Sequence, residues 1–134
     1  MRMMLLIACL GALLQAQDKA IKKVPITPTQ ASSGQQMFNT YCAVCHGTDG
    51  RGDGPAASAL KEAPSDLTLL AEKNGGKFPE NRVVIKIRAV DSPAHGSKEM
   101  PIWGTLLSSI SSSSGEVQLR TSNLVKYIET LQAK

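Results

Sequence analysis

The chain has 134 residues, of which 42% are hydrophobic and 19% charged, so it is long enough for one ordinary domain and too short to divide comfortably into two. Fifteen Lys and Arg against eleven Asp and Glu give a net charge of +4 without a run of like charges, which does not indicate nucleic-acid binding and at most permits docking on an acidic partner. Only five side chains are aromatic, so we expect something else to fill part of the interior.

The N-terminus is typical of a short export signal. Arg2 precedes an apolar run over residues 3–14, and small or polar residues follow it. This run is shorter than the roughly 20 apolar residues that span a bilayer. We therefore expect a signal peptide at residues 1–16, cleaved near Ala16, and a periplasmic protein. Association with a membrane is expected only if this segment is retained or lipidated, and Cys9 comes too early in the signal for an ordinary lipid attachment site.

Two prolines and a polar composition predict a flexible arm over residues 17–32, ahead of a domain at residues 33–134. Ser33 is suited to cap a helix that begins at Gly34. On this helix Phe38, Cys42 and Cys45 share one face, because they are spaced by four and then three residues.

The middle of the chain predicts short, interrupted elements. Four glycines and two prolines between residues 47 and 64 predict a loop, with a helical turn at Ala56–Lys61. Asp66 can cap a short helix that the Asn74-Gly75-Gly76 stretch stops. The pattern over residues 79–90 fits a helix and a strand equally well, so periodicity leaves this segment undecided.

Irregular structure is predicted over residues 91–104, followed by a flexible surface loop in the serine-rich stretch 108–116. The chain then closes with a predicted amphipathic helix. Its apolar face comprises Val117, Leu124, Ile128 and Leu131, widened by Leu119, Val125 and Tyr127.

The strongest chemical signal is the Cys-x-x-Cys-His motif formed by Cys42, Cys45 and His46. On a helix these three side chains can reach one planar object lying against the same face. The two thiols can add to the vinyl groups of a haem as thioethers, and the histidine can bind its iron. Covalent attachment is useful after export, because a non-covalent cofactor can be lost. The motif therefore predicts one covalently bound haem c with its iron.

Other uses of two cysteines fit the sequence less well. A structural zinc site would need Cys42, Cys45, His46 and His95 together, and adjacent Cys45 and His46 are awkwardly placed to share a tetrahedral ion. A thioredoxin-like dithiol should follow a strand, and no strand is predicted before Tyr41. A plain disulfide is the remaining alternative.

Elimination among the methionines points to Met100 as the ligand on the opposite face of the iron. Three methionines lie in the signal, and Met37 shares the helix of His46 and cannot reach round. Met100 lies in a loop-like segment, and its thioether would favour ferrous iron. His95 is a competitor, interpreted as an exposed loop histidine. For the second ring nitrogen of His46 we expect the carbonyl of Pro55 as acceptor.

With these motifs the sequence resembles the class I c-type cytochromes, in their small exported bacterial form, from Gly34 to the C-terminus. The resemblance implies an all-α fold, a cytochrome c-like orthogonal helix bundle wrapped around one covalent haem. It implies that the first and last helices cross where Gly34 and Phe38 meet Leu124 and Tyr127, and that residues 79–90 are helical. The serine-rich insert departs from the family pattern. The residues carrying the resemblance are Gly34, Phe38, Cys42–Gly47, Gly50, Gly52–Pro55, Asp66–Thr68, Gly76–Pro79, Met100–Gly104, Leu124 and Tyr127.

The leading hypothesis is a one-electron carrier with haem-binding residues Cys42, Cys45, His46 and Met100, of which His46 and Met100 bind the iron. No catalytic residue is expected. Its partners would be a redox protein donor and acceptor, as in a respiratory chain, and the protein would be a monomer or a complex subunit. The alternatives are a haem-bearing subunit or domain of a larger dehydrogenase or oxidase, and a haem protein that binds a small ligand.

Overall fold

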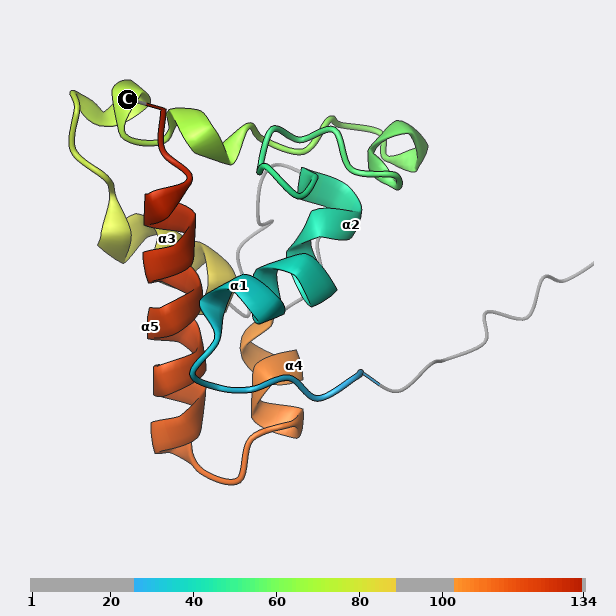
Figure 1. Cartoon of the computed structure of the whole chain (residues 1–134), viewed down its shortest axis with the longest axis vertical. Coiled ribbons are helices and arrows are strands. Elements are labelled where there is room, and N and C mark those ends of the chain that lie inside the picture. Colours follow the sequence, from blue (N-terminus) through green and yellow to red (C-terminus); the bar gives the residue numbers. More distant parts are fainter. Residues whose placement is uncertain (1–25, 89–102, 134) are drawn as a thin grey trace, which may run out of the picture.

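The computed structural model describes residues 26–88 and 103–133, and all regular elements within these ranges are helical (Figure 1). This confirms the predicted all-α class. The predicted signal peptide, residues 17–25 of the arm, and the segment 89–102 with His95 and Met100 lie outside the described residues. The α-helices are α1 (Gly34–Met37), α2 (Ala43–His46), α3 (Glu80–Arg88), α4 (Trp103–Ser109) and α5 (Ser114–Thr130), with a π-helical turn η1 (Phe38–Cys42) and 3-10 turns η2 (Ala57–Ala59), η3 (Leu67–Leu69) and η4 (Glu72–Asn74).

The first helix is not regular along its length. Ser33 caps it as predicted, since its Oγ accepts the Gln36 N–H at 3.1 Å. Beyond Met37, however, the backbone widens into the π-helical turn η1, in which the N–H of Ala43 donates to the carbonyl of Phe38, five residues earlier. The predicted continuous helix is thus wrong in detail. The wide turn lies between Phe38 and Cys42, where a helix interruption often marks a functional site.

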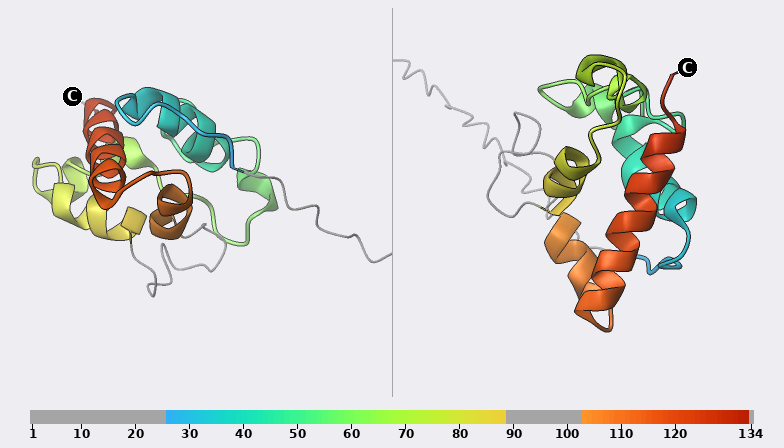
Figure 2. Two further views of the ribbon diagram at one scale, coloured as in Figure 1. Left: turned by 90° about the horizontal axis from the view of Figure 1, so that it is seen from below. Right: turned by 90° about the vertical axis from the view of Figure 1, so that its left-hand side faces the viewer.

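The first and last helices cross in close contact, as predicted. A Cβ atom at Gly34 would overlap the carbonyl oxygen of Asn123 on α5, so only glycine allows this approach. Beside it the rings of Phe38 and Tyr127 pack with centroids 5.4 Å apart and an interplanar angle of 55°. Figure 2 shows α1 and α2 on one side of the molecule and α3 and α4 on the other, with α5 along one edge.

The core forms where these helices meet. Val117 and Tyr127 of α5, and Leu131 directly after it, pack partly buried against the core, as the predicted apolar face requires. Leu119 is an exception, because 49% of it is exposed, and its predicted place on the buried face was wrong. The buried hydrophobic residues are Met37, Phe38, Tyr41, Ala43, Ile87, Leu107, Leu124, Val125 and Ile128.

The serine-rich stretch is helical at both ends, so the surface loop predicted over residues 108–116 is shorter than expected. Helix α4 extends through Ser109 and α5 starts at Ser114, which leaves only residues 110–113 between them. Serine hydroxyls bond to the carbonyl four residues earlier, from Ser108 to Gly104 at 2.8 Å and from Ser111 to Leu107 at 2.6 Å. With Leu107 fully buried, α4 is anchored to the core despite its weak helix formers.

The short elements predicted in the middle of the chain are present. The turn η2 falls within the predicted Ala56–Lys61, and the Asp66 carboxylate caps η3 by accepting the Thr68 N–H at 2.9 Å. Gly75 ends η4 in the left-handed conformation. The ambiguous segment 79–90 contains α3, as the family resemblance implied.

Residues 26–32, the end of the predicted flexible arm, pack against the domain instead. Thr29 is only 9% exposed, and Arg120 of α5 donates to its carbonyl at 2.8 Å. Asn123 of the same helix donates to the carbonyl of Ala31 at 2.9 Å. Within residues 26–88 and 103–133, none of the helices combines the length and apolar character that a membrane span needs.

Candidate functional site

The motif residues lie at the end of the first helical stretch. Cys42 ends η1, and Cys45 and His46 belong to α2. Both cysteines are half-buried and neither is in a disulfide, whereas His46 is only 8% exposed. The structure therefore brings three of the four predicted haem-binding residues together, and the fourth, Met100, lies outside the described residues.

A predominantly apolar cavity opens beside Cys42 and His46. Its volume is about 180 Å³, and it is open on one side. Its walls consist mainly of leucine, isoleucine, valine and tryptophan side chains, with a thiol and an imidazole at one side. This arrangement fits a flat apolar macrocycle that is attached through sulfur and bound through nitrogen. The lining residues are Cys42, His46, Ser65, Leu67, Leu70, Pro79, Arg82, Val83, Lys86, Ile87, Trp103, Leu124 and Ile128.

The ring of His46 is oriented by the backbone of Ser65. Its Nδ1 lies 3.1 Å from the Ser65 carbonyl oxygen, so the predicted acceptor, Pro55, was wrong. The reason is the path of the loop. Ala56, the residue after Pro55, donates its N–H to the Val44 carbonyl at 2.8 Å, on the outer side of the helix. The chain returns to His46 about ten residues later, at Ser65.

The electrostatics of His46 favour its neutral form. Burial lowers the pKa of its imidazole, and the hydrogen bond to Ser65 offsets part of that effect. The neutral ring is the form that binds a metal, and an acceptor at Nδ1 fixes its orientation. Burial and the Ser65 carbonyl therefore give His46 the neutral, oriented ring that a metal ligand needs.

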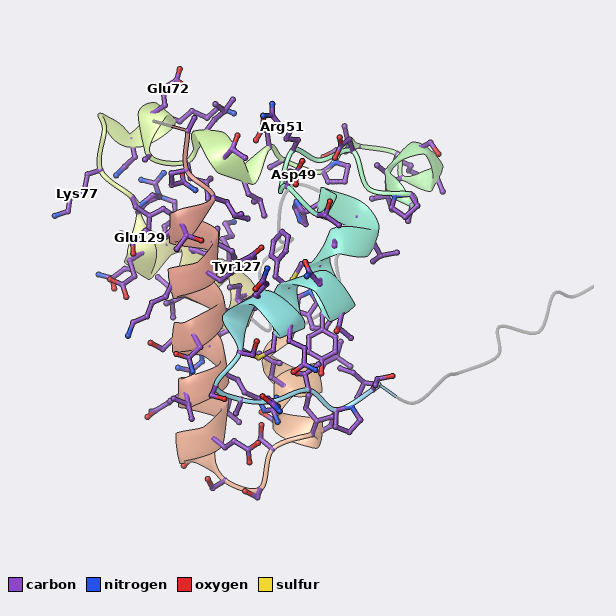
Figure 3. The ribbon with its side chains drawn as sticks, in the orientation of Figure 1. Asp49, Arg51, Glu72, Lys77, Tyr127 and Glu129 are labelled. Carbon is purple, nitrogen blue, oxygen red and sulfur yellow. The ribbon has the colours of Figure 1, made fainter. Side chains whose placement is uncertain are left out.

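The glycine-rich loop closes the end of α2. Gly52 N–H donates to the His46 carbonyl at 2.8 Å and Gly54 N–H to the Cys45 carbonyl at 3.0 Å, which satisfies backbone groups that a helix end leaves unpaired. A Cβ atom at Gly54 would lie 2.5 Å from the Ala43 carbonyl oxygen. Figure 3 shows Asp49 and Arg51 of this loop, whose side chains are exposed. The loop thus turns backbone toward the motif and charge toward solvent.

The thiol chemistry argues against a redox-active dithiol. Burial raises the pKa of the Cys42 thiol to about 12, and the neighbouring Cys45 contributes in the same direction. A catalytic dithiol has a lowered cysteine pKa instead. Across the part of the chain that the structure describes, no group of three or more His, Cys, Asp or Glu side chains is placed to hold a metal ion; His95 of the zinc alternative lies outside that part.

The segment that carries Met100 is bounded by two parts of the cavity wall. It leaves α3 at Arg88 and returns at Trp103, the first residue of α4. A Cβ atom at Gly104 would lie 2.5 Å from the Arg88 carbonyl oxygen, so the two ends of the segment are in contact. Met100 precedes Trp103 by three residues, a chain length of at most about 11 Å. Its role as a ligand stays a prediction.

Several residues around the site have no signal in the sequence. Ser65 acts through its carbonyl oxygen, which any residue could supply. Trp103 was part of the family resemblance but not of the predicted site, although it lines the cavity. The burial of Arg120 has no signal either, because this residue lies among the apolar positions of the closing helix, where its side chain interrupts the pattern.

A family model described as Cytochrome c matches residues 31–102, more than half of the chain. No curated protein and no solved structure shows a significant match. The chain therefore belongs to the cytochrome c family. Proteins of this family bind haem c covalently, with its iron, and carry electrons between redox partners; they are generally not enzymes. The cavity lined by Cys42 and His46, with Cys45 next to His46 in the chain, has the chemistry that this cofactor needs.

Proposed function

We propose that the protein is an exported one-electron carrier that holds haem c through Cys42 and Cys45 and ligates the iron with His46 and Met100. The observation that carries the proposal is a buried, oriented His46 beside Cys42 in the wall of an apolar cavity. When bound, the haem supplies an iron that takes up and returns one electron. Two fixed protein ligands keep the geometry of the two oxidation states similar.

The side chains around the cavity assist this role. Ser65 holds the imidazole of His46 in one orientation through the hydrogen bond to Nδ1. The apolar walls exclude water and disfavour the extra positive charge of ferric iron, and a methionine thioether acts in the same direction. A fairly high reduction potential is therefore expected.

We propose export to the periplasm because residues 1–16 are typical of an export signal, and because covalent attachment prevents loss of the haem there. Cleavage near Ala16 would remove Cys9 and Arg2, so that Cys42 and Cys45 are the two cysteines of the mature chain. Mass spectrometry of the protein isolated from the periplasmic fraction is expected to show a chain that starts near residue 17 and carries one haem. An intact N-terminus in the membrane fraction would contradict this.

The variant Met100→Ala tests the sixth ligand. We expect it to lower the midpoint potential, to change the visible spectrum and to let the ferrous protein bind carbon monoxide, which the wild type does not bind. Met37→Leu is the control, because Met37 is fully buried on the helix that precedes the motif, and a swap of similar volume there should change neither property.

An unchanged spectrum and potential in Met100→Ala would overturn the proposed ligation. Fast, tight carbon monoxide binding by the wild type would indicate a small-ligand-binding haem protein instead. Stable co-purification with a dehydrogenase or oxidase would indicate a subunit rather than a free carrier.

A further inference from the structure

We propose that Gln132, two residues beyond the end of α5, is a positioning residue for His46. Through the segment 65–71 it sets the hydrogen bond that the Ser65 carbonyl accepts from the imidazole ring. This inference deepens the proposed function and rests on it, because His46 has to bind the iron for Gln132 to affect the reduction potential. Every contact in the connection lies within the described residues.

The side chain of Gln132 uses both ends of its amide to hold another segment against α5. Its Oε1 accepts the N–H of Ala71 at 2.8 Å. Its Nε2 donates to the carbonyl of Leu67 at 2.8 Å and to that of Ile128 at 2.9 Å. An amide can do this because it carries an acceptor oxygen and a donor NH2 group. The end of the chain thus lies against the stretch that contains η3 (Figure 1).

The segment that this amide holds is closely bonded between Leu67 and Ser65. Asp66 Oδ1 accepts the N–H of Thr68 at 2.9 Å and its hydroxyl at 2.6 Å. The N–H of Leu67 donates to the carbonyl of Gly50 at 2.7 Å, so both backbone polar groups of Leu67 are fixed. Because the turn 66–68 is held together by its own side chains, a displacement of Leu67 moves Ser65 as well.

The peptide between Pro64 and Ser65 is also held by the glycine-rich loop. A Cβ atom at Gly52 would overlap the Pro64 carbonyl oxygen and would lie 3.5 Å from the carbonyl carbon of Ser65. The backbone of Gly52 therefore packs directly against this peptide. Ser65 is thus restrained from its N-terminal side by Gly52 and from its C-terminal side by Leu67.

The restrained carbonyl determines the state of the His46 ring. A carbonyl oxygen only accepts, so Nδ1, 3.1 Å from the Ser65 oxygen, carries the ring proton and Nε2 has the lone pair that can bind iron. A hydrogen bond from Nδ1 makes the imidazole a more basic ligand. Because a more basic ligand favours ferric over ferrous iron, weakening this bond should raise the midpoint potential.

The test compares Gln132→Met with Asn123→Leu in the full holoprotein. Each substitution replaces a side-chain amide by an apolar side chain of similar size. Asn123 lies on α5 and donates to the carbonyl of Ala31 at 2.9 Å, so it holds a neighbouring segment in the same way but outside the connection. A merely structural role of Gln132 would lower stability in both variants and leave the His46 ring as it is.

Two measurements follow the hydrogen bond of His46. Nuclear magnetic resonance of the reduced protein gives the rate at which the Nδ1 proton exchanges with solvent, and redox titration gives the midpoint potential. Loss of one net hydrogen bond corresponds to about a two- to tenfold change in an equilibrium constant. In Gln132→Met we expect exchange to be faster by that factor and the midpoint potential to rise by up to about 59 mV, which corresponds to a tenfold change for one electron. Asn123→Leu should change neither.

Gln132→Glu separates the two ends of the amide. Its carboxylate still accepts the N–H of Ala71 but cannot donate to the carbonyl of Leu67. We expect the same faster exchange of the His46 Nδ1 proton in this variant. The potential is not compared, because the added negative charge changes it directly.

Wild-type exchange in Gln132→Met, or equally faster exchange in Asn123→Leu, would overturn the proposal. Wild-type exchange in Gln132→Glu would contradict the route through Leu67. If Gln132→Met yields no holoprotein, Gln132→Glu decides alone. Failure of the proposed function shows separately, as a wild-type visible spectrum in His46→Ala.

Discussion

Gly54 shows how closely the backbone approaches the end of α2. A Cβ atom at this position would lie 2.5 Å from the Ala43 carbonyl oxygen and 2.6 Å from backbone atoms of Val44 and Cys45. These are main-chain atoms inside the motif helix, so they cannot move aside without moving the sulfur and nitrogen atoms that are proposed to hold the cofactor. The loop supplies a surface without side chains at this contact.

We therefore expect Gly54→Ala to lower the free energy of unfolding by about 1–3 kcal/mol and to reduce the yield of holoprotein. Gly115→Ala is the matched control, because Gly115 lies in α5, where an added methyl group would meet only the Ser113 Oγ at 3.8 Å, and alanine favours a helix. Denaturant unfolding followed by circular dichroism measures both. Equal stability of Gly54→Ala and the wild type would show that the loop can move away from the backbone of α2 and accommodate the methyl group.

At the scale of the element, α5 begins in a set of hydrogen bonds centred on Glu116. Ser113 caps the helix by accepting the Glu116 N–H at 3.2 Å, and the Glu116 carboxylate accepts the backbone N–H and the hydroxyl of Ser112 at 2.8 and 2.7 Å. Arg120 approaches the same carboxylate one turn later. The turn between α4 and α5 is closed by these contacts, together with the serine hydroxyls of α4.

These bonds predict a pH dependence of stability. Hydrogen bonds from Ser112, followed by Arg120, lower the pKa of Glu116 from 4.5 to about 2. A carboxyl whose pKa is lower in the folded state stabilises the fold above its unfolded pKa and loses that contribution on acidification. Between pH 4.5 and 2 the wild type should therefore lose stability, whereas Glu116→Gln should start lower at neutral pH and fall less over this range.

Thermal unfolding followed by circular dichroism at a series of pH values provides the measurement. Glu129→Gln makes the same charge change at an exposed position near the other end of α5 and should follow the wild-type curve. Parallel curves for Glu116→Gln and the wild type would contradict the assigned role of this carboxylate.

Elements with local signals could be predicted from the sequence. The Ser33 cap and the Asp66 cap follow from side chains that bond to nearby N–H groups. The sequence could not decide between helix and strand for the segment containing α3, because the fold alone determines which of its isoleucines is buried. Ile85 is 62% exposed and Ile87 only 7%. The π-helical turn η1 and the orientation of His46 by Ser65 depend on backbone groups that no residue type specifies.

At the scale of the whole molecule, the helices surround the cavity in addition to packing on the hydrophobic core. Residues from the two ends of the described chain line it, including Cys42 before the loops and Ile128 near the end of α5. The haem proposed for this space would supply the apolar bulk that five aromatic residues do not. The fold and its cofactor should therefore form together.

The double variant Cys42→Ser/Cys45→Ser, prepared without haem, tests this dependence. We expect a weakly helical protein without a cooperative thermal transition, because the apolar walls of the cavity would be left without packing partners. Near-ultraviolet circular dichroism and thermal melts measure the outcome, with wild-type holoprotein as reference. A sharp thermal transition near that of the holoprotein would show that the helices fold cooperatively without haem.

The contact between Gly104 and Arg88 has a consequence for how such a protein can diversify. Gly104 of α4 lies against the Arg88 carbonyl at the end of α3, so the two helices meet where the intervening segment departs and returns. A different stretch could be spliced in at these two points, and the driving force for electron uptake would change while the framework persisted. If Met100 of this segment is the iron ligand, redox tuning and architecture would be separately inheritable.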